Sequence, residues 1–371
     1  MIRILHVLGG LDRGGAETML MNIYRNIDKD KIQFDFVVHT NKVGEYEQEI
    51  VNGGGKIYHF PRYNIKNHMS YKKVWREFLQ NHKEYKIIHG HQRGAAFIYL
   101  KLAKEDNRIT IMHSHSTSSR GSGLEKILKN LLRYPMRNYV DYPFACSIKA
   151  GQWLFGNCIL KNINFRVIKN GIDISKYIFD AEKREELQDK LGIKGKIVLG
   201  HVGSFSIPKN HMFLLDIFSE FNKNYPNSIL LLVGDGELRS SIQDRIKALE
   251  LQDRVIFIGV VSNVCDYLQT MDIFVFPSIF EGLPVSVVEA QASGLQCILS
   301  DSITNEIDLN CGLITWQSLK DNCKIWSETI GRHMKYCRKN TSKYISNAGY
   351  GIKETSKEIT DIYLKINERI I

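Results

Sequence analysis

The chain has 371 residues, which is too long for one ordinary hydrophobic core and suits two domains of ~150–180 residues each. Hydrophobic residues make up 43% of the chain and charged residues 24%, a balance that excludes a disordered chain and is ordinary for a folded protein. The formal net charge of +10 leaves nucleic acid, an anionic membrane surface and phosphorylated small molecules open as partners, beside a merely solvated basic surface.

Targeting and redox signals are weak in this sequence. No stretch reaches the ~18 apolar residues that span a bilayer, and the N-terminal run MIRILHVLGG lacks the cleavage region of a signal peptide. The seven cysteines show no paired spacing and no C-x-x-C motif, which is typical of reduced thiols. These features predict a cytoplasmic protein, and they are compatible with a peripheral position on the inner face of the plasma membrane.

The first half of the chain alternates apolar runs with amphipathic helices. The run IRILHVL (2–8) predicts a buried parallel strand, GGLDRGG (9–15) a glycine-rich loop, and AETMLMNIYRNI (16–27) a helix. Further strands are predicted at 33–40, 85–91, 108–116 and 142–147. Strands that alternate with helices favour right-handed βαβ units around a parallel sheet.

A connector and a second series of strands follow residue 170. The Asn-Gly turn in 166–177 and the charged run 180–196 predict the connector. Strands are then predicted at 196–204, 228–236, 254–260, 272–278 and 295–301. The sequence therefore predicts two facing doubly wound Rossmann-like domains, with ligands beyond the carboxyl ends of the strands and in the interdomain cleft. The boundaries are 1–170, with the C-terminal helix 353–371 packing back on it, and 171–352.

Two loops at strand ends suit an anionic ligand. The loop 9–15 lacks the G-x-G-x-x-G spacing of a dinucleotide fingerprint, and Gly15 stands where a P-loop has lysine. What remains is a turn that feeds a helix N-terminus, where a phosphate or a plain tight turn fits equally well. Lys209 stands between a strand and a helix, where its charge can reach a diphosphate, although a surface lysine has the same signature.

The stretch FEGLPVSVVEAQASG (280–294) carries two glutamates, Glu281 and Glu289, with seven residues between them. Pro284 suits the first position of a helix, and the amides around that helix start form an anion site. Glu281 can accept hydrogen bonds from sugar hydroxyls. Glu289 lies on an otherwise apolar helix face, so it needs a buried partner or a ligand hydroxyl. An ordinary strand–loop–helix unit with two surface acids is the alternative.

Read in chain order, GGAE, KNGID, VGSFSIPKNH, LLLVGDGELR, VIFIGV and FEGLPVSVVEAQASG resemble the landmarks of glycosyltransferase family 4, a retaining group with the GT-B fold. The resemblance runs from the first strand to the last helix and is strongest over 196–301. The segments 140–156 and 347–363 resemble enzymes that assemble capsular or extracellular polysaccharide. The resemblance implies an acceptor-binding N-terminal domain and a C-terminal domain that binds the nucleotide-sugar.

The resemblance also implies roles for the matching residues. Glu281 would be catalytic near the donor sugar, together with His113 or, as the less favoured choice, His115. Glu289 would lie near the ribose and Lys209 would neutralise the diphosphate. The remaining donor-binding residues would be Gly15, Gly203, Ser204, Gly282 and Leu283, with Gly14, Val260 and Arg239 as further candidates.

One position departs from the family pattern. The family often has arginine after the glycine of VGxF, and this chain has Ser204, so the diphosphate clamp loses a charge-assisted bond worth ~1.5–3 kcal/mol. Arg239 or His211 could compensate. The helix start and Lys209 would stabilise the leaving diphosphate by fixed electrostatics, so no metal and no cofactor are expected.

The implied reaction moves a sugar from a nucleotide-sugar, most simply a UDP-sugar, to a lipid-linked diphosphate saccharide or an oligosaccharide. A lipid-linked acceptor would need a membrane surface. The segment 120–139 has an apolar stripe opposite five basic residues, which predicts a membrane-surface helix or an amphipathic helix on the domain core.

Three other functions compete with this interpretation. The pairs HGH and HSH each end a predicted strand, so four imidazoles could hold zinc in a metal-dependent hydrolase, although no nearby carboxylate completes such a site. These histidines are His89, His91, His113 and His115. A nucleic-acid-binding protein fits the charge, but no module signature appears. A nucleotide-sugar epimerase of the same fold would act on the donor without an acceptor.

Overall fold

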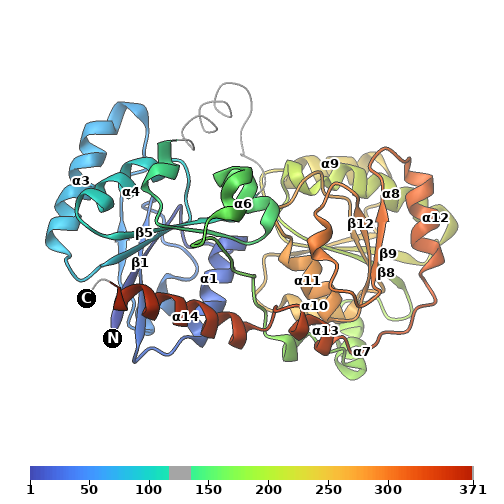
Figure 1. The fold of residues 1–371 in the computed structure, drawn as a ribbon. Coiled ribbons are helices and arrows are strands. Elements are labelled where there is room, and N and C mark those ends of the chain that lie inside the picture. The colour runs from blue at the N-terminus through green and yellow to red at the C-terminus, as the bar shows by residue number, and fades with distance from the viewer. Residues whose placement is uncertain (117–134, 370–371) are drawn as a thin grey trace. The chain divides into compact units, whose positions relative to one another are not determined.

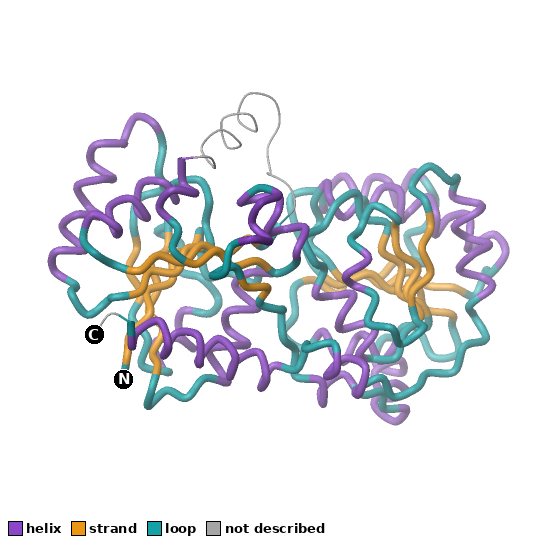
Figure 2. Tube along the Cα trace, in the orientation of Figure 1, coloured by secondary structure: helices purple, strands orange, loops and turns teal. Residues whose placement is uncertain are grey.

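The computed structural model describes residues 1–116 and 135–369. Residues 120–134 of the predicted basic helix therefore lie outside the described residues. The chain divides into two compact units, Met1–Gly171 with Ile352–Ile371, and Ile172–Gly351. Each unit is an α/β structure built on its own sheet, with helices on both faces (Figures 1 and 2). We describe each unit by itself.

The first unit is built on a parallel sheet of seven strands in the order β3-β2-β1-β4-β5-β6-β7. These strands are β1 (Ile2–Leu8), β2 (Ile32–Val38), β3 (Ile57–His59), β4 (Ile87–Gly90), β5 (Ile109–Ser114), β6 (Tyr142–Ala145) and β7 (Arg166–Val167). The strand order reverses between β1 and β4, which makes the carboxyl ends of these two strands a usual place for a ligand. The α-helices are α1 (Gly15–Asn26), α2 (Glu47–Asn52), α3 (His68–Asn81), α4 (Ala96–Glu105), α6 (Ile148–Phe155) and α14 (Ile352–Glu368), and the 3₁₀ helices are η1 (Ile65–Asn67), η2 (Arg137–Tyr139) and η3 (Asn157–Lys161).

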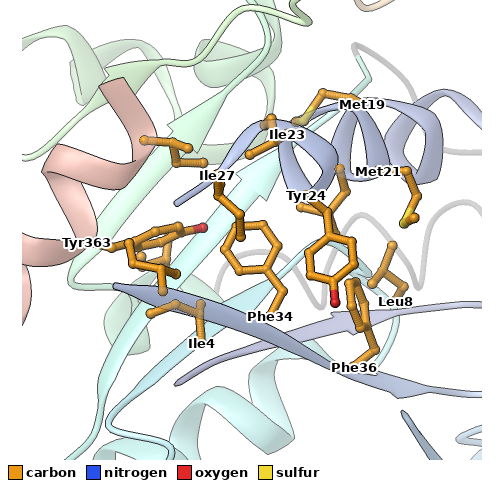
Figure 3. Packing of buried hydrophobic residues seen from close by; sticks show 14 of the residues in the cluster. Ile4, Leu8, Met19, Met21, Ile23, Tyr24, Ile27, Phe34, Phe36 and Tyr363 are labelled. Atoms are coloured by element: carbon orange, nitrogen blue, oxygen red, sulfur yellow. The ribbon is translucent and has the colours of Figure 1, made fainter. Parts of the chain in front are cut away.

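Two hydrophobic layers sandwich this sheet. Helices α1 and α14 cover one face, where side chains of α1 and Tyr363 of α14 point onto Phe34 and Phe36 of β2 (Figure 3). The ring of Tyr363 meets Phe34 edge-on, with centroids 5.9 Å apart. Helices α3 and α4 cover the other face around the fully buried Trp75. Burying a large side chain such as Tyr363 stabilises the fold by ~1.5–3 kcal/mol, so α14 is an integral part of this unit.

The second unit is built on a parallel sheet of six strands in the order β10-β9-β8-β11-β12-β13. They are β8 (Ile197–Val202), β9 (Ser228–Val233), β10 (Val255–Gly259), β11 (Ile273–Phe276), β12 (Gln296–Ser300) and β13 (Ile314–Gln317). Here the order reverses between β8 and β11. The α-helices are α7 (Ala181–Lys190), α8 (His211–Asn224), α9 (Arg239–Ala248), α10 (Val264–Thr270), α11 (Val285–Ala292), α12 (Cys323–Arg332) and α13 (Ser342–Asn347), and the 3₁₀ helices are η4 (Ile174–Tyr177), η5 (Ile207–Lys209) and η6 (Asn305–Ile307).

Helices α8, α9 and α12 enclose the hydrophobic cluster on one face of this second sheet. Two details of the unit differ from the sequence prediction. The charged run 180–196 forms helix α7 and the turn that leads into β8 instead of a plain connector, because Asp180 caps the helix and Arg184 forms an ion pair with Asp272 at 2.7 Å. Pro284 is the N-cap of α11 instead of its first helical residue.

The described part of the chain contains no helix that is both long and apolar enough to cross a bilayer.

Candidate active site

The loops that follow β8 and β11 come together at the switch point of the second sheet. The Ile279 amide donates to the carbonyl of Pro208 at 2.8 Å, and the Asn210 side chain donates to the carbonyl of Pro277 at 3.1 Å. Asn210 adopts a left-handed conformation with φ 58°, which turns the chain from η5 into α8. Backbone contacts therefore fix the position of Lys209 beside the loop that carries Glu281.

Lys209 and Glu281 form an ion pair. The Lys209 ammonium lies 2.8 Å from a Glu281 carboxylate oxygen and 4.6 Å from the centre of the Phe276 ring. Both side chains are largely shielded from water, with 16% and 15% of their surface exposed. The structure thus brings together two residues that the sequence analysis names separately. Gly282 and Leu283 follow immediately and are buried, and α11 begins without a side-chain cap.

The second glutamate of the pair has a partner that the sequence analysis does not name. The Tyr177 hydroxyl donates to a carboxylate oxygen of Glu289 at 2.7 Å. Burial raises the pKa of Glu289, and the hydrogen bond from Tyr177 partly opposes that rise. No motif links Tyr177 to Glu289, because 112 residues separate them and only the placement of η4 beside α11 joins them.

The surroundings of Ser204 bear on the missing arginine. Its hydroxyl lies 3.0 Å from that of Ser206. His211 is buried between His201 and Phe205, and burial together with the nearby charge of Lys209 lowers the pKa of His211 to about 4. A histidine that is neutral at pH 7 cannot replace a positive charge.

Arg239, the other candidate to replace the missing arginine, already forms an ion pair with a neighbouring carboxylate. Its guanidinium forms an ion pair with Asp235 at 2.8 Å and lies 5.0 Å from the centre of the Phe257 ring. Val260, another candidate donor contact, directly follows β10 and is 51% exposed.

In the first unit, the glycine loop after β1 leaves room for a ligand. Gly14 is the N-cap of α1, without a side-chain cap, and Gly15 is the first residue of that helix. A Cβ added at Gly15 would meet no atom within 4 Å, so the space in front of the helix is open. At Gly14 a Cβ would come within 2.2 Å of the Glu17 carboxylate, which is the end of a flexible side chain and can move aside.

Five histidines gather at the switch point of the first sheet. Two of their contacts form a chain: His6 Nδ1 lies 3.0 Å from His91 Nε2, and His91 Nδ1 lies 2.8 Å from His115 Nε2. His113 is fully buried and neither of its ring nitrogens has a hydrogen-bond partner in the described structure, whereas His115 is partly exposed. Four of these histidines belong to H-x-H pairs and were predicted to cluster, whereas His6 was not predicted because it interrupts an apolar strand without any H-x-H signal.

Comparisons with known proteins identify the family. Residues 183–310 match the family model described as glycosyl transferases group 1, and residues 13–176 match glycosyltransferase family 4. The chain is 34% identical to the putative glycosyltransferase EpsF of Bacillus subtilis, over 97% of this chain and 96% of that protein. The chain belongs to glycosyltransferase family 4. It is also 24% identical to the capsular polysaccharide biosynthesis glycosyltransferase CapH of Staphylococcus aureus, over 98% and 99% of the two chains.

Solved structures agree on the fold. A crystal structure of Anabaena HepE in complex with UDP and glucose matches with a TM-score of 0.79 and 19% identity, over 98% of this chain and 99% of that one. The lipopolysaccharide glycosyltransferase WaaG matches with a TM-score of 0.72 and 14% identity, over 97% and 99%. The predicted GT-B architecture and the predicted family are confirmed, and these findings do not support the metal-dependent hydrolase.

Proposed function

We propose that the protein transfers a sugar from a UDP-sugar to a lipid-linked diphosphate saccharide or an oligosaccharide, with retention of configuration, in the synthesis of a capsular or extracellular polysaccharide. The names of several relatives support this proposal. CapH is a capsular polysaccharide enzyme. An Escherichia coli relative, 32% identical over 36% of each chain, is named as a galactosyltransferase that uses UDP-Gal and a diphosphoundecaprenol-linked GlcNAc. HepE has been crystallised with UDP.

The ion pair of Lys209 and Glu281 at the start of α11 carries the proposal. A donor diphosphate would draw the ammonium away from Glu281, because two phosphate groups offer more negative charge than one carboxylate. The amides of Gly282 and Leu283 at the helix start would then bind phosphate and sugar oxygens. Charge that develops on the leaving diphosphate would meet fixed positive groups without a cofactor or a metal ion.

Release from Lys209 would give Glu281 its catalytic role. Its carboxylate would accept hydrogen bonds from hydroxyls of the donor sugar and so hold the reacting carbon in place. Glu289, oriented by Tyr177, would accept hydrogen bonds from the ribose. Gly203, Ser204, Val260 and Arg239 would complete the donor contacts from the second unit.

The first unit would bind the acceptor. Gly15 stays our predicted donor contact in this unit, with Gly14 as a further candidate, because the open space at the start of α1 suits a phosphate or hydroxyl group. Of the two candidate histidines, the partial exposure of His115 supports a direct contact with a ligand, and the buried His113 would support its neighbour. A cytoplasmic enzyme of this kind would meet a lipid-linked acceptor at the inner face of the plasma membrane, and segment 120–139 stays our prediction for that contact.

Thermal stability with UDP, GDP, ADP and CMP tests the donor class, without added metal. A ligand at 100 times its dissociation constant adds ~2.7 kcal/mol to the folded state. We expect UDP to raise the unfolding midpoint of the wild type and not that of Lys209→Ala. The matched control is Lys223→Ala, which removes an exposed lysine from α8 of the same unit and should respond to UDP like the wild type.

Turnover then tests the reaction itself. UDP-glucose, UDP-galactose and UDP-GlcNAc are offered with a diphosphoundecaprenol-linked GlcNAc, and released UDP and the product mass are measured. The anomeric configuration of the product, read by NMR, tests retention. The proposal fails if no nucleotide stabilises the wild type. UDP release without an acceptor product would instead point to a hydrolase of nucleotide-sugars, and conversion of one UDP-sugar into another without UDP release would point to an epimerase.

A further inference from the structure

The histidines at the carboxyl ends of β4 and β5 form a cluster larger than the one or two histidines that the proposed function uses. One ring nitrogen from each of His91, His113 and His115 lies within 4.8 Å of the other two. We propose that these three imidazoles bind one divalent ion of a late first-row transition metal, with zinc as the reference ion. This site belongs to the first unit, whereas Lys209, Glu281 and Glu289 belong to the second.

The donor set fits such an ion. Imidazole nitrogens bind zinc at ~2.0–2.1 Å, so two ligands of a tetrahedral ion lie ~3.3 Å apart. The separation of His91 Nδ1 and His115 Nε2, 2.8 Å, is close to that spacing. The rings of His113 and His115 are stacked, 24° from parallel, so one of them must turn to aim its lone pair at the ion. His115 has the freedom to turn because it is partly exposed.

A buried orphan group supports the site. Both ring nitrogens of His113 are shielded from water and neither forms a hydrogen bond within the described residues. Buried polar groups without partners are rare, because their interactions with water are lost without replacement. A bound metal ion gives one of these nitrogens a partner, and this accounts for a histidine where an apolar residue would otherwise pack as well.

His6 is placed to accept the second N–H of His91 in the tautomer that a metal requires. When Nδ1 of His91 binds the ion, its proton resides on Nε2, and Nε2 lies 3.0 Å from Nδ1 of His6. Metal-ligating histidines usually donate their second N–H to an acceptor in this way. The His89 ring stacks on His91 with centroids 4.3 Å apart, and its Nδ1 contacts the Tyr363 hydroxyl of α14 at 2.6 Å.

The charge state of the cluster suits an ion bound through nitrogen. Burial and the mutual repulsion of the rings lower the pKa of His91 and His113 well below the ordinary value, and burial lowers the pKa of His115 to about 3, with the charge of Arg93 adding to the effect. The neutral imidazole is the form that binds a metal ion. The three nitrogen donors disfavour magnesium and calcium, which prefer oxygen ligands.

An ion can reach this site, and it would keep one position open. His115 is partly exposed and 9% of the surface of His91 is exposed, and the cluster lies at the switch point where open α/β sheets bind ligands. Three protein ligands leave a fourth position for water or for an oxygen of a ligand, as in zinc sites with three histidines. Such an ion would organise the part of the first unit where we propose that the acceptor binds.

Metal binding to the full chain tests the proposal directly. Tag-free protein is stripped with a chelator and titrated with Zn²⁺ by calorimetry, and with Co²⁺ by visible absorption, which reports tetrahedral nitrogen ligation. We expect one ion per chain.

Three variants separate the site from adventitious binding. His115→Gln removes a partly exposed ligand and should weaken Zn²⁺ binding at least ~10-fold, while His6→Phe removes the supporting acceptor and should weaken it ~10–100-fold. His59→Gln, an exposed histidine of the same unit, is the matched control and should bind like the wild type. Circular dichroism confirms that each variant is folded. Weak binding of several ions to the wild type, or equal affinity in wild type and His115→Gln, overturns the proposal.

Discussion

Replacing Lys209 by methionine removes the charge that we assign to the donor diphosphate and keeps a side chain of similar length. One charge-assisted hydrogen bond is worth ~1.5–3 kcal/mol. With ~1.4 kcal/mol per tenfold change in affinity, Lys209→Met should bind UDP about 10- to 150-fold more weakly than the wild type. Isothermal titration of UDP against both proteins, without metal, measures this ratio.

The same substitution should also lower the stability of the second unit. Glu281 loses a partner at 2.8 Å while only 15% of its side chain is exposed, so part of its lost hydration is no longer compensated. Because some water reaches the pair, we expect a cost near the lower end of ~1–3 kcal/mol. In a unit of this size each kcal/mol lowers the unfolding midpoint by ~2–4 °C.

A second substitution separates the two effects. Glu281→Gln in the Lys209→Met background removes the carboxylate that needs the ammonium, so it should restore at least half of the lost stability. It should not restore UDP binding, because the positive charge is still missing. Our reasoning about the clamp is refuted if Lys209→Met binds UDP as the wild type does. Our reasoning about the ion pair is refuted if the double variant is as unstable as the single one.

Three further predictions concern buried titratable groups. Burial raises the pKa of Glu289, so keeping this carboxylate ionised at pH 7 lowers the stability of the fold. Glu289→Gln should therefore raise the unfolding midpoint, while the affinity for UDP falls ~10-fold. A lower unfolding midpoint would contradict this prediction. Tyr177→Phe should weaken UDP binding severalfold, since Glu289 loses its orienting bond, with unchanged affinity as the contrary result. At about pH 5.5 the metal-free protein should be less stable than at pH 7.5 by ~1.4 kcal/mol per buried histidine. Each of these histidines has a lowered pKa in the folded state, so its contribution to stability is complete above the unfolded-state pKa of ~6.5 and is lost as the pH falls below that value. Equal unfolding midpoints at pH 7.5 and 5.5 would contradict this prediction. The histidines are His6, His89, His91, His113 and His115.

Most of the fold could be predicted from the sequence because its central strands are continuous apolar runs. The run at 2–8 coincides with β1, and runs at 228–236 and 272–278 contain β9 and β11. The strands β3, β7 and β13 were not predicted. They are two to four residues long, lie at or near sheet edges and are only partly buried, so they carry little of the hydrophobic signal.

The donor residues could be named one by one, but their contacts depend on sheet topology. Lys209 and Glu281 each follow a strand, and they meet because β8 and β11 are neighbours although β9 and β10 separate them in sequence. The need of Glu289 for a hydrogen-bond partner could be predicted, because its carboxylate lies on an otherwise apolar helix face. The identity of that partner, Tyr177, depends on how the chain enters the second unit through η4, and local sequence does not encode that path.

The histidine cluster, too, could be predicted only in part from the sequence. An H-x-H pair in a strand places both rings on one face, so the sequence alone puts His89 with His91 and His113 with His115. The register of the sheet then sets His6 opposite His89, which no spacing in the sequence reveals. The face on which these rings lie is covered by α14, whose Tyr363 comes from the far end of the chain. Burial of the cluster, and hence the neutral state that makes its nitrogens available to a metal, therefore depends on a contact between residues 274 positions apart.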